Sequence, residues 1–307
     1  MSLGDDYLKY SKRKYGMDHD RYPWSILQKR KPVTWPGGAR VALWVVPALE
    51  FFPLDQPAMP FRAPGGMVTP YPDLRHYTLR DYGNRVGVFR VFEVLDGLGI
   101  KASVAVNSKV AERCPFLINE IARRGWEIIA HGVDMGRLHY GGMDEAEEAA
   151  QVEESIGTLR KLSGQPVTGW LSPAKSESMN TLDLVAAADI EYVCDWINDD
   201  MPYPIKTKSG DIHSMPHSHE IDDQTIMLHY QHTEAEFVQQ VSDQFRVLYS
   251  EAAEQGGRIM AVTIHPWMSG QPHRIKALER ALAQVMEHDG VWSATGAEIL
   301  AAFRAQQ

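Results

Sequence analysis

Short apolar segments alternate with longer amphipathic segments along most of this chain, and the alternation restricts the folds that it can adopt. Residues 40–46, 126–130 and 259–264 are largely apolar runs, typical of strands buried on both faces of a parallel sheet. Residues 86–98 and 143–162 carry apolar side chains at helical spacing. Repeated strand–helix units of this length predict an α/β fold whose parallel sheet is either closed into a barrel or doubly wound.

The remaining elements follow from the same two periodicities and from the turn residues that bound them. Residues 47–72 are rich in Pro and Gly and carry no helix or strand signal, which is typical of a functional loop. Further strands are predicted at residues 101–106, 167–171, 192–195, 212–215 and 225–228 and from Val291 onward, and further helices at residues 115–124, 180–188, 235–255, 274–287 and 296–305.

The chain of 307 residues divides into two parts of different character. Residues 1–37 are rich in Tyr, Lys, Arg, Pro and Trp without periodicity, and we expect an arm on the surface or on a neighbouring subunit. Residues 38–307 contain every strand–helix unit and no internal repeat, so they predict one α/β domain.

Charge and cysteine content indicate which partners and which cellular compartment to expect. The net charge of −9 argues against nucleic acid and anionic membranes, because both require clustered Lys and Arg. No apolar run reaches the length of a membrane span, and the N-terminus is charged rather than signal-like. The two cysteines, Cys114 and Cys194, lie far apart in sequence, which favours a reducing compartment. We therefore expect a cytoplasmic protein that acts on a small molecule.

Polar residues follow several of the predicted strands at the point where each strand ends. Glu50, His131, Ser172, Asp195 and His265 all occupy such positions. The carboxyl ends of parallel strands face one end of an α/β fold, so these side chains should converge. Carboxylates and imidazoles that converge from separate strands are typical of a hydrolytic site.

The motifs around these residues occur in a fixed order. They are Glu50, Ala130-His131-Gly132, residues 169–173 (Gly-Trp-Leu-Ser-Pro), residues 199–203 (Asp-Asp-Met-Pro-Tyr) and residues 263–266 (Thr-Ile-His-Pro). This order of motifs resembles that of the polysaccharide deacetylase superfamily, also called the NodB homology fold. The resemblance extends from about residue 40 to the C-terminal helix. The chain is most similar to the branch of metal-independent allantoinases and peptidoglycan-deacetylase-like hydrolases of cyclic amides. The resemblance implies a distorted (β/α) barrel and hydrolysis of a non-peptide C–N bond.

The chain departs from the metal-dependent members of that superfamily at two motifs. Their first motif contains Asp, whereas Ala48 and Glu50 stand at the matching positions here. Their second motif is His-x-x-x-His, whereas His131 is followed four residues later by Met135. A thioether is a poor zinc ligand, and the two remaining ligands are fewer than the three expected of a catalytic zinc site. The sequence therefore predicts a site without metal or other cofactor.

Amide hydrolysis without a metal needs a general base and fixed donors for the developing oxyanion. Glu50 and His265 are the candidates for proton transfer. His131 could orient the water or donate to the oxyanion. Arg85 could hold a carbonyl or carboxylate through its planar guanidinium, or equally form a structural ion pair. A strained cyclic amide or ureide suits this apparatus better than an unactivated acetamide.

Four further residues are candidates for substrate binding, each with a structural alternative. Trp170 and Trp267 could stack on substrate, although such residues are more often core aromatics. Asp199 belongs to an acidic turn, where Asp commonly caps the backbone. His217 lies in a polar stretch that lines the pocket of related allantoinases, and a solvated loop is its alternative.

Three hypotheses of function follow. The first is a metal-independent hydrolase of a small cyclic amide or ureide. The second is a metal-dependent deacetylase of N-acetylated sugars with an unusual ligand set. The third is a catalytically degenerate member that binds a carbohydrate or metabolite, which the loss of the base position at Ala48 favours. The aromatic arm and the resemblance to tetrameric allantoinases predict a homo-oligomer, either a dimer or a tetramer.

Overall fold

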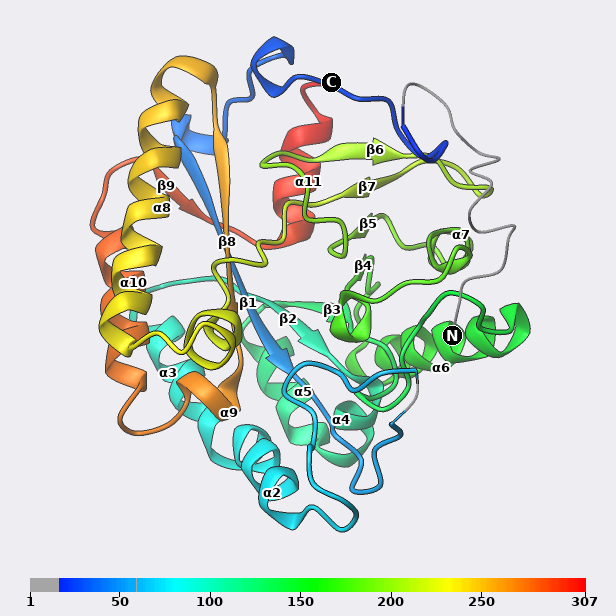
Figure 1. Cartoon of the computed structure of the whole chain (residues 1–307). Helices are drawn as coiled ribbons and strands as arrows, with labels where there is room; N and C mark the ends of the chain where they lie inside the picture. Colours follow the sequence, from blue (N-terminus) through cyan, green and yellow to red (C-terminus); the bar gives the residue numbers. More distant parts are fainter. Residues whose placement is uncertain (1–16, 59) are drawn as a thin grey trace.

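A curled, mostly parallel sheet forms the centre of the molecule, with helices packed along its outer side (Figure 1). This structure is a computed structural model that describes residues 17–58 and 60–307. The strands lie in the order β6-β7-β5-β4-β3-β2-β1-β8, and β9 also pairs with β1. Their bounds are β1 Val41–Leu49, β2 Ser103–Val106, β3 Glu127–Ala130, β4 Gly169–Trp170, β5 Tyr192–Val193, β6 Tyr203–Ile205, β7 Ile212–Ser214, β8 Arg258–Ile264 and β9 Val291–Ser293.

The helices alternate with these strands, as the sequence predicts. The α-helices are α2 Leu74–Tyr82, α3 Val88–Gly97, α4 Ser108–Arg113, α5 Pro115–Arg123, α6 Glu145–Ser163, α7 Thr181–Ala187, α8 Glu234–Gln255, α9 Pro266–Ser269, α10 Ile275–Met286 and α11 Gly296–Arg304. Short 3-10 turns occur at η1 Leu27–Lys29, η2 Pro36–Gly38 and η4 Pro173–Lys175, and π-helical turns at η3 Gly83–Gly87 and η5 Thr225–His229.

Strand β1 runs through the middle of the core and is buried along its whole length. It pairs in parallel with β8 over seven residues on one edge, and with β9 and β2 on the other. Its alternate side chains enter two apolar clusters: Leu43 and Val45 pack under the outer helices, and Trp44 and Val46 fill the inside of the curl. Residues of α11 close the inner cluster.

The sheet curls like a barrel but does not close by strand pairing within the described residues. Strand β8 ends one side, and the antiparallel pair of β6 and β7 ends the other. One backbone hydrogen bond, from Thr263 N to Ile221 O at 3.1 Å, crosses between the segment after β7 and β8. The α/β class and the distorted barrel are therefore confirmed.

One local prediction of secondary structure is wrong, and the helices α2, α4 and α9 and the strand β6 went unpredicted. Residues 225–228 form the π-helical turn η5 and not a strand, because the Asp222 side chain caps the backbone amides of Gln224 and Thr225 and starts a helical turn. Helix α2 went unpredicted because it is mostly polar, and Arg80 is its one buried residue. Among the described residues, the loop between β1 and α2 has no helix or strand, as predicted.

The described part of the predicted N-terminal arm contacts the barrel of its own chain. Arg21 pairs with Asp183 at 2.7 Å, and the buried Trp35 donates its indole N–H to Arg258 O at 2.9 Å. Residues 1–16 of that arm lie outside the described residues. Its predicted contact with a neighbouring subunit stays a prediction.

Candidate active site

Three strands deliver Glu50, His131 and His265 to one point at the carboxyl end of the sheet. Glu50 directly follows β1, His131 follows β3 and His265 follows β8. Glu50 Oε1 lies 3.8 Å from His131 Nε2 and 3.9 Å from His265 Nε2. All three side chains are buried. The sequence therefore predicted a group of residues that the fold does bring together.

Glu50 is fixed from both its backbone and its side chain. Asn84 donates its side-chain amide to Glu50 O at 2.8 Å, and Trp267 Nε1 donates weakly to Oε2 at 3.4 Å. Burial alone would raise the pKa of Glu50, but the neighbouring His265 and His131 outweigh burial and lower it. Glu50 is therefore an ionised carboxylate at neutral pH, shielded from solvent.

His131 has a defined tautomer. Its Nδ1 lies 2.7 Å from Leu171 O, and a carbonyl oxygen can only accept, so Nδ1 carries the proton. In the neutral ring the lone pair is then on Nε2, which faces Glu50. The next residue must be glycine, because Gly132 has a φ of 65° and a Cβ there would lie 2.4 Å from Pro173 Cγ. This explains the His-Gly ending of the strand.

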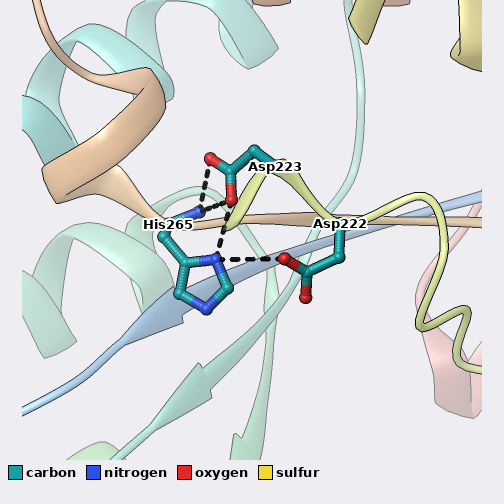
Figure 2. Close-up of side chains that lie close together, drawn as sticks. All are labelled: Asp222, Asp223 and His265. Carbon is teal, nitrogen blue, oxygen red and sulfur yellow. Dashed lines mark hydrogen bonds and ion pairs between the residues drawn. The ribbon is translucent and has the colours of Figure 1, made fainter. Parts of the chain in front are cut away.

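His265 is held by a buried pair of aspartates (Figure 2). Its Nδ1 donates to Asp223 Oδ1 at 2.7 Å and lies 3.7 Å from Asp222 Oδ1. Burial opposes protonation of this ring, but Asp222, Glu50 and Asp223 together outweigh it and raise the pKa of His265 to about 10. His265 is therefore an imidazolium at neutral pH, with Nε2–H directed toward Glu50.

A cavity of about 70 Å³ adjoins these three residues. A cavity of this size holds on the order of five water molecules, so it suits a small ring. Pro64 of the loop between β1 and α2 lines it, and that loop is pinned in place. Arg80 Nε donates to Gly65 O at 2.6 Å, and Gln56 donates its amide to Met135 O at 3.0 Å.

The metal of the metal-dependent deacetylases does not fit the residues present here. Met135, at the second histidine position, is buried in an apolar cluster with Phe52, Ala63 and Leu138 and offers only a thioether. Ala48 at the first motif has no ligand atom. Glu50 and His131 alone supply fewer ligands than a catalytic zinc site uses.

A second cluster of ligand types, Asp222, Asp223 and His265, is already engaged in hydrogen bonds (Figure 2). Both oxygens of Asp223 accept from the backbone N–H of His265. Asp222 Oδ1 accepts from two backbone amides, and His265 Nδ1 carries a proton. One free oxygen, Asp222 Oδ2, is too few ligands for a metal ion.

Two of the five residues that the sequence assigned to substrate binding lie at this site. His217 lines the cavity and is 1% exposed, with Nε2 3.1 Å from Thr263 Oγ1. Trp267 contacts Glu50 through its indole N–H, and the Arg80 guanidinium lies 3.8 Å from its ring centroid. The Trp267 ring therefore contacts both Glu50 and Arg80.

The other three assigned residues lie away from the cavity. Arg85 points into solvent from η3 and pairs with Asp81 at 3.5 Å. Trp170 is fully buried on the helix side of β4, where it donates to Ser172 Oγ at 2.8 Å. Asp199 holds Arg30 of the arm through two hydrogen bonds. Each makes the contact of its structural alternative: Arg85 forms an ion pair, Trp170 is a core aromatic, and Asp199 caps the backbone by accepting from Met201 N at 3.0 Å.

Four further residues at the site were not predicted from the sequence: Asp223, Arg80, Lys175 and Gln224. Asp223 meets His265 across 42 positions of sequence, which no local pattern reveals. Lys175 lines the cavity from η4, where Ala174 and Lys175 both have positive φ. The Pro173 turn after β4 was the available signal for Lys175, since strand ends carry the site.

The fold and the site together define an α/β-barrel hydrolase with a buried carboxylate, two imidazoles and an Asp–His pair. Comparisons with known proteins show which proteins this chain is similar to. The family model described as polysaccharide deacetylase matches residues 76–193. The crystal structure of PuuE allantoinase is 26% identical, with a TM-score of 0.82, and the match covers 93% of this chain and 98% of that one.

Two further relatives agree. A structure from Pseudomonas aeruginosa PAO1, described as a probable polysaccharide deacetylase, is 26% identical with a TM-score of 0.82, covering 93% of this chain and 99% of that one. A Schizosaccharomyces pombe protein, provisionally described as a polysaccharide deacetylase, is 23% identical over 291 residues, or 88% of this chain and 87% of that protein. Over most of its length the chain is therefore similar to proteins described as polysaccharide deacetylases and to an allantoinase.

None of the helices formed by the described residues combines the length and the apolar character that a bilayer span requires.

Proposed function

We propose that this protein hydrolyses a C–N bond of a small cyclic amide or ureide without a metal. The observation that carries the proposal is the replacement of a metal ligand by Met135, which is buried among Phe52, Ala63 and Leu138. In place of a metal, the site offers an ionised Glu50 between His131 and a protonated His265. These groups supply a base, an orienting acceptor and an acid.

Glu50 and His131 are placed to hold the attacking water. Glu50 Oε1 and the lone pair of His131 Nε2 are two acceptors 3.8 Å apart. One water at about 2.8 Å from each can donate a hydrogen to both. Its oxygen lone pair then faces the cavity and the substrate carbonyl. As the C–O bond forms, the water proton passes to Glu50, which acts as general base.

His265 is placed to protonate the leaving nitrogen. Its Nδ1–H is held by Asp223, so its Nε2–H is directed to the cavity. When the tetrahedral intermediate collapses, the C–N bond breaks and this proton goes to nitrogen. Glu50 then returns the water proton to His265 Nε2, 3.9 Å away, which restores both groups. The products are a carboxylate and a free amine or amide.

The size and closure of the cavity favour a small ring as substrate. The cavity measures about 70 Å³, and the loop carrying Pro64 and Gly65 is fixed above it by Arg80. Ring strain or a conjugated leaving nitrogen lowers the barrier that this metal-free apparatus must overcome. The similarity to PuuE allantoinase over nearly the whole chain also supports this substrate class.

Turnover before and after chelation tests the proposal. Allantoin and succinimide are incubated with native protein, and ring opening is followed by absorbance and by product analysis. We expect activity to persist after exhaustive dialysis against chelator. Glu50→Gln should lower kcat by at least about 100-fold, since it removes the base and keeps the side-chain shape. Glu220→Gln, at an exposed carboxylate outside the cavity, is the matched control.

Two outcomes would contradict the proposal. Loss of activity on chelation, restored by zinc, would support a metal-dependent deacetylase, and N-acetylated chitooligosaccharides would then be the substrates to examine. Binding of these molecules without turnover by either native protein or zinc-loaded protein would support a degenerate binding member.

A further inference from the structure

One wall of the cavity comes from a single segment, residues 216–224, which joins β7 to η5. It contributes His217, Asp222 and Gln224 to the lining. These polar side chains are 1%, 6% and 5% exposed. Buried polar groups normally find partners within the protein, so an unpaired one beside a cavity calls for an explanation.

Asp222 has one oxygen engaged and one free. Oδ1 caps η5 by accepting from Gln224 N at 2.9 Å and Thr225 N at 3.1 Å. Within the described chain, Oδ2 has no hydrogen-bond partner, and Figure 2 shows it turned away from the His265 ring. A nearly buried carboxylate oxygen beside the catalytic imidazolium is thus available to accept an N–H from a ligand.

On the same wall, Gln224 and His217 each have a buried side-chain nitrogen without a hydrogen-bond partner among the described residues. The two atoms are Gln224 Nε2 and His217 Nδ1. Gln224 Nε2 lies against Gly65 of the loop, where a Cβ would come within 2.5 Å of it. The amide therefore sits at the junction of wall and loop, and a ligand carbonyl would supply its missing acceptor.

We infer that this wall recognises the leaving half of the substrate, and that the substrate is a cyclic imide or ureide with a free N–H. Asp222 Oδ2 accepts the N–H of the leaving nitrogen, and Gln224 Nε2 donates to the second carbonyl bonded to that nitrogen. A simple lactam lacks that carbonyl, and an N-alkylated ring lacks the N–H. This inference rests on the proposed function, because it places the leaving nitrogen beside His265.

Selectivity among three rings tests the inference: succinimide, N-methylsuccinimide and 2-pyrrolidinone. We expect native protein to prefer succinimide over N-methylsuccinimide by about tenfold or more in kcat/KM, with a matching difference in Kd by calorimetry. Asp222→Asn keeps the Oδ1 cap but places an NH₂ group at the cavity, so this preference should fall to within about threefold. Circular dichroism and thermal unfolding confirm that the variant is folded.

Gln224→Met tests the second contact, since it keeps length and removes the donor. We expect the variant to raise the Kd of succinimide and to leave 2-pyrrolidinone, which has no second carbonyl, unchanged as a competitive inhibitor. Glu220→Gln again serves as the control and should alter neither ratio.

The possible results distinguish failure of this inference from failure of the proposed function on which it rests. Equal selectivity in native protein and Asp222→Asn overturns the inference even if turnover is metal-independent. Activity that needs zinc but keeps the Asp222-dependent selectivity overturns the metal-free proposal and supports the inference. Failure of native protein to bind both succinimide and allantoin overturns the inference as well.

Discussion

At the scale of single residues, the site depends on opposite charges held together without water. Glu50 is ionised because two imidazoles face it, and His265 is protonated because three carboxylates surround it. Removing either partner leaves an uncompensated buried charge, which is costly. The same pairing supplies an acid and a base at neutral pH from groups that would otherwise titrate near 4 and 6.5.

The Asp223–His265 pair predicts a specific change in the pH dependence of activity. If His265 must be protonated, activity falls as pH rises through its pKa, which Asp222, Glu50 and Asp223 raise to about 10 against the effect of burial. Asp223→Asn removes one of these charges, so the basic limb should move to lower pH. The measurement is kcat against pH for both proteins. An unmoved basic limb would show that His265 is not the acid.

Residues at strand ends could be predicted from the sequence, whereas their partners could not. Glu50, His131 and His265 follow continuous apolar strands, and the geometry of a parallel sheet alone brings such positions together. Asp223 follows the long segment after β7, and Arg80 lies on α2, beyond the long loop after β1. The paths of both segments depend on tertiary contacts. Arg85 and Trp170 show the converse, since the motif context was present but the side chains face solvent and core.

At the scale of elements, the turn η3 links the loop side of the site to α9 through close backbone packing. A Cβ on Gly87 would lie 2.1 Å from Pro266 O, and a Cβ on Gly83 would lie 2.7 Å from Trp267 N. Both glycines therefore allow η3 to approach the residues that directly follow His265. Asn84, between them, holds the Glu50 carbonyl. This one turn therefore contacts both the end of β1 and the residues that follow β8.

Alanine substitution at two glycines tests that packing. Gly87→Ala forces the backbone of α9 to shift and should lower the free energy of unfolding by about 1–3 kcal/mol. Gly97→Ala, at the end of α3, meets nothing within 4 Å and should be neutral or stabilising by up to about 1 kcal/mol. Urea unfolding measures both. Equal effects from the two substitutions would contradict the close-packing argument.

Element prediction succeeded where burial is continuous and failed where polar contacts decide the structure. Strands β1 and β8 are continuous apolar runs, and α8 begins with a Thr233–Glu236 capping box, so a periodic pattern with clear ends was present. Helix α2 is instead started by the buried Asp73, which accepts from His76 N at 3.1 Å. Such a side-chain contact overrides the apolar pattern at η5 as well.

The barrel as a whole is closed at its amino end by α11, and its strand pairing is open between the edge strands β6 and β8. The closed end carries the inner apolar cluster, and the charged site occupies the other end. Global stability should therefore respond to the ionisation of this site.

The ionisation of His265 predicts a loss of stability in mild alkali. Its folded pKa of about 10 lies above the usual value of about 6.5 in the unfolded chain. The stabilisation is thus complete below about pH 6.5 and is lost as pH rises through about 10. Urea unfolding should show a lower free energy at pH 9 than at pH 7, with a smaller difference in Asp223→Asn. An identical difference in the two proteins would contradict this assignment.

The apolar cluster around Met135 also bears on how this site can change in evolution. A histidine at position 135 would place a polar imidazole among Phe52, Ala63 and Leu138, and Phe52 and Ala63 belong to the loop that closes the cavity. The side chain that would ligate a metal and the side chain that packs under the loop therefore occupy the same position. A metal ligand gained there would come at the expense of the apolar packing that holds the loop.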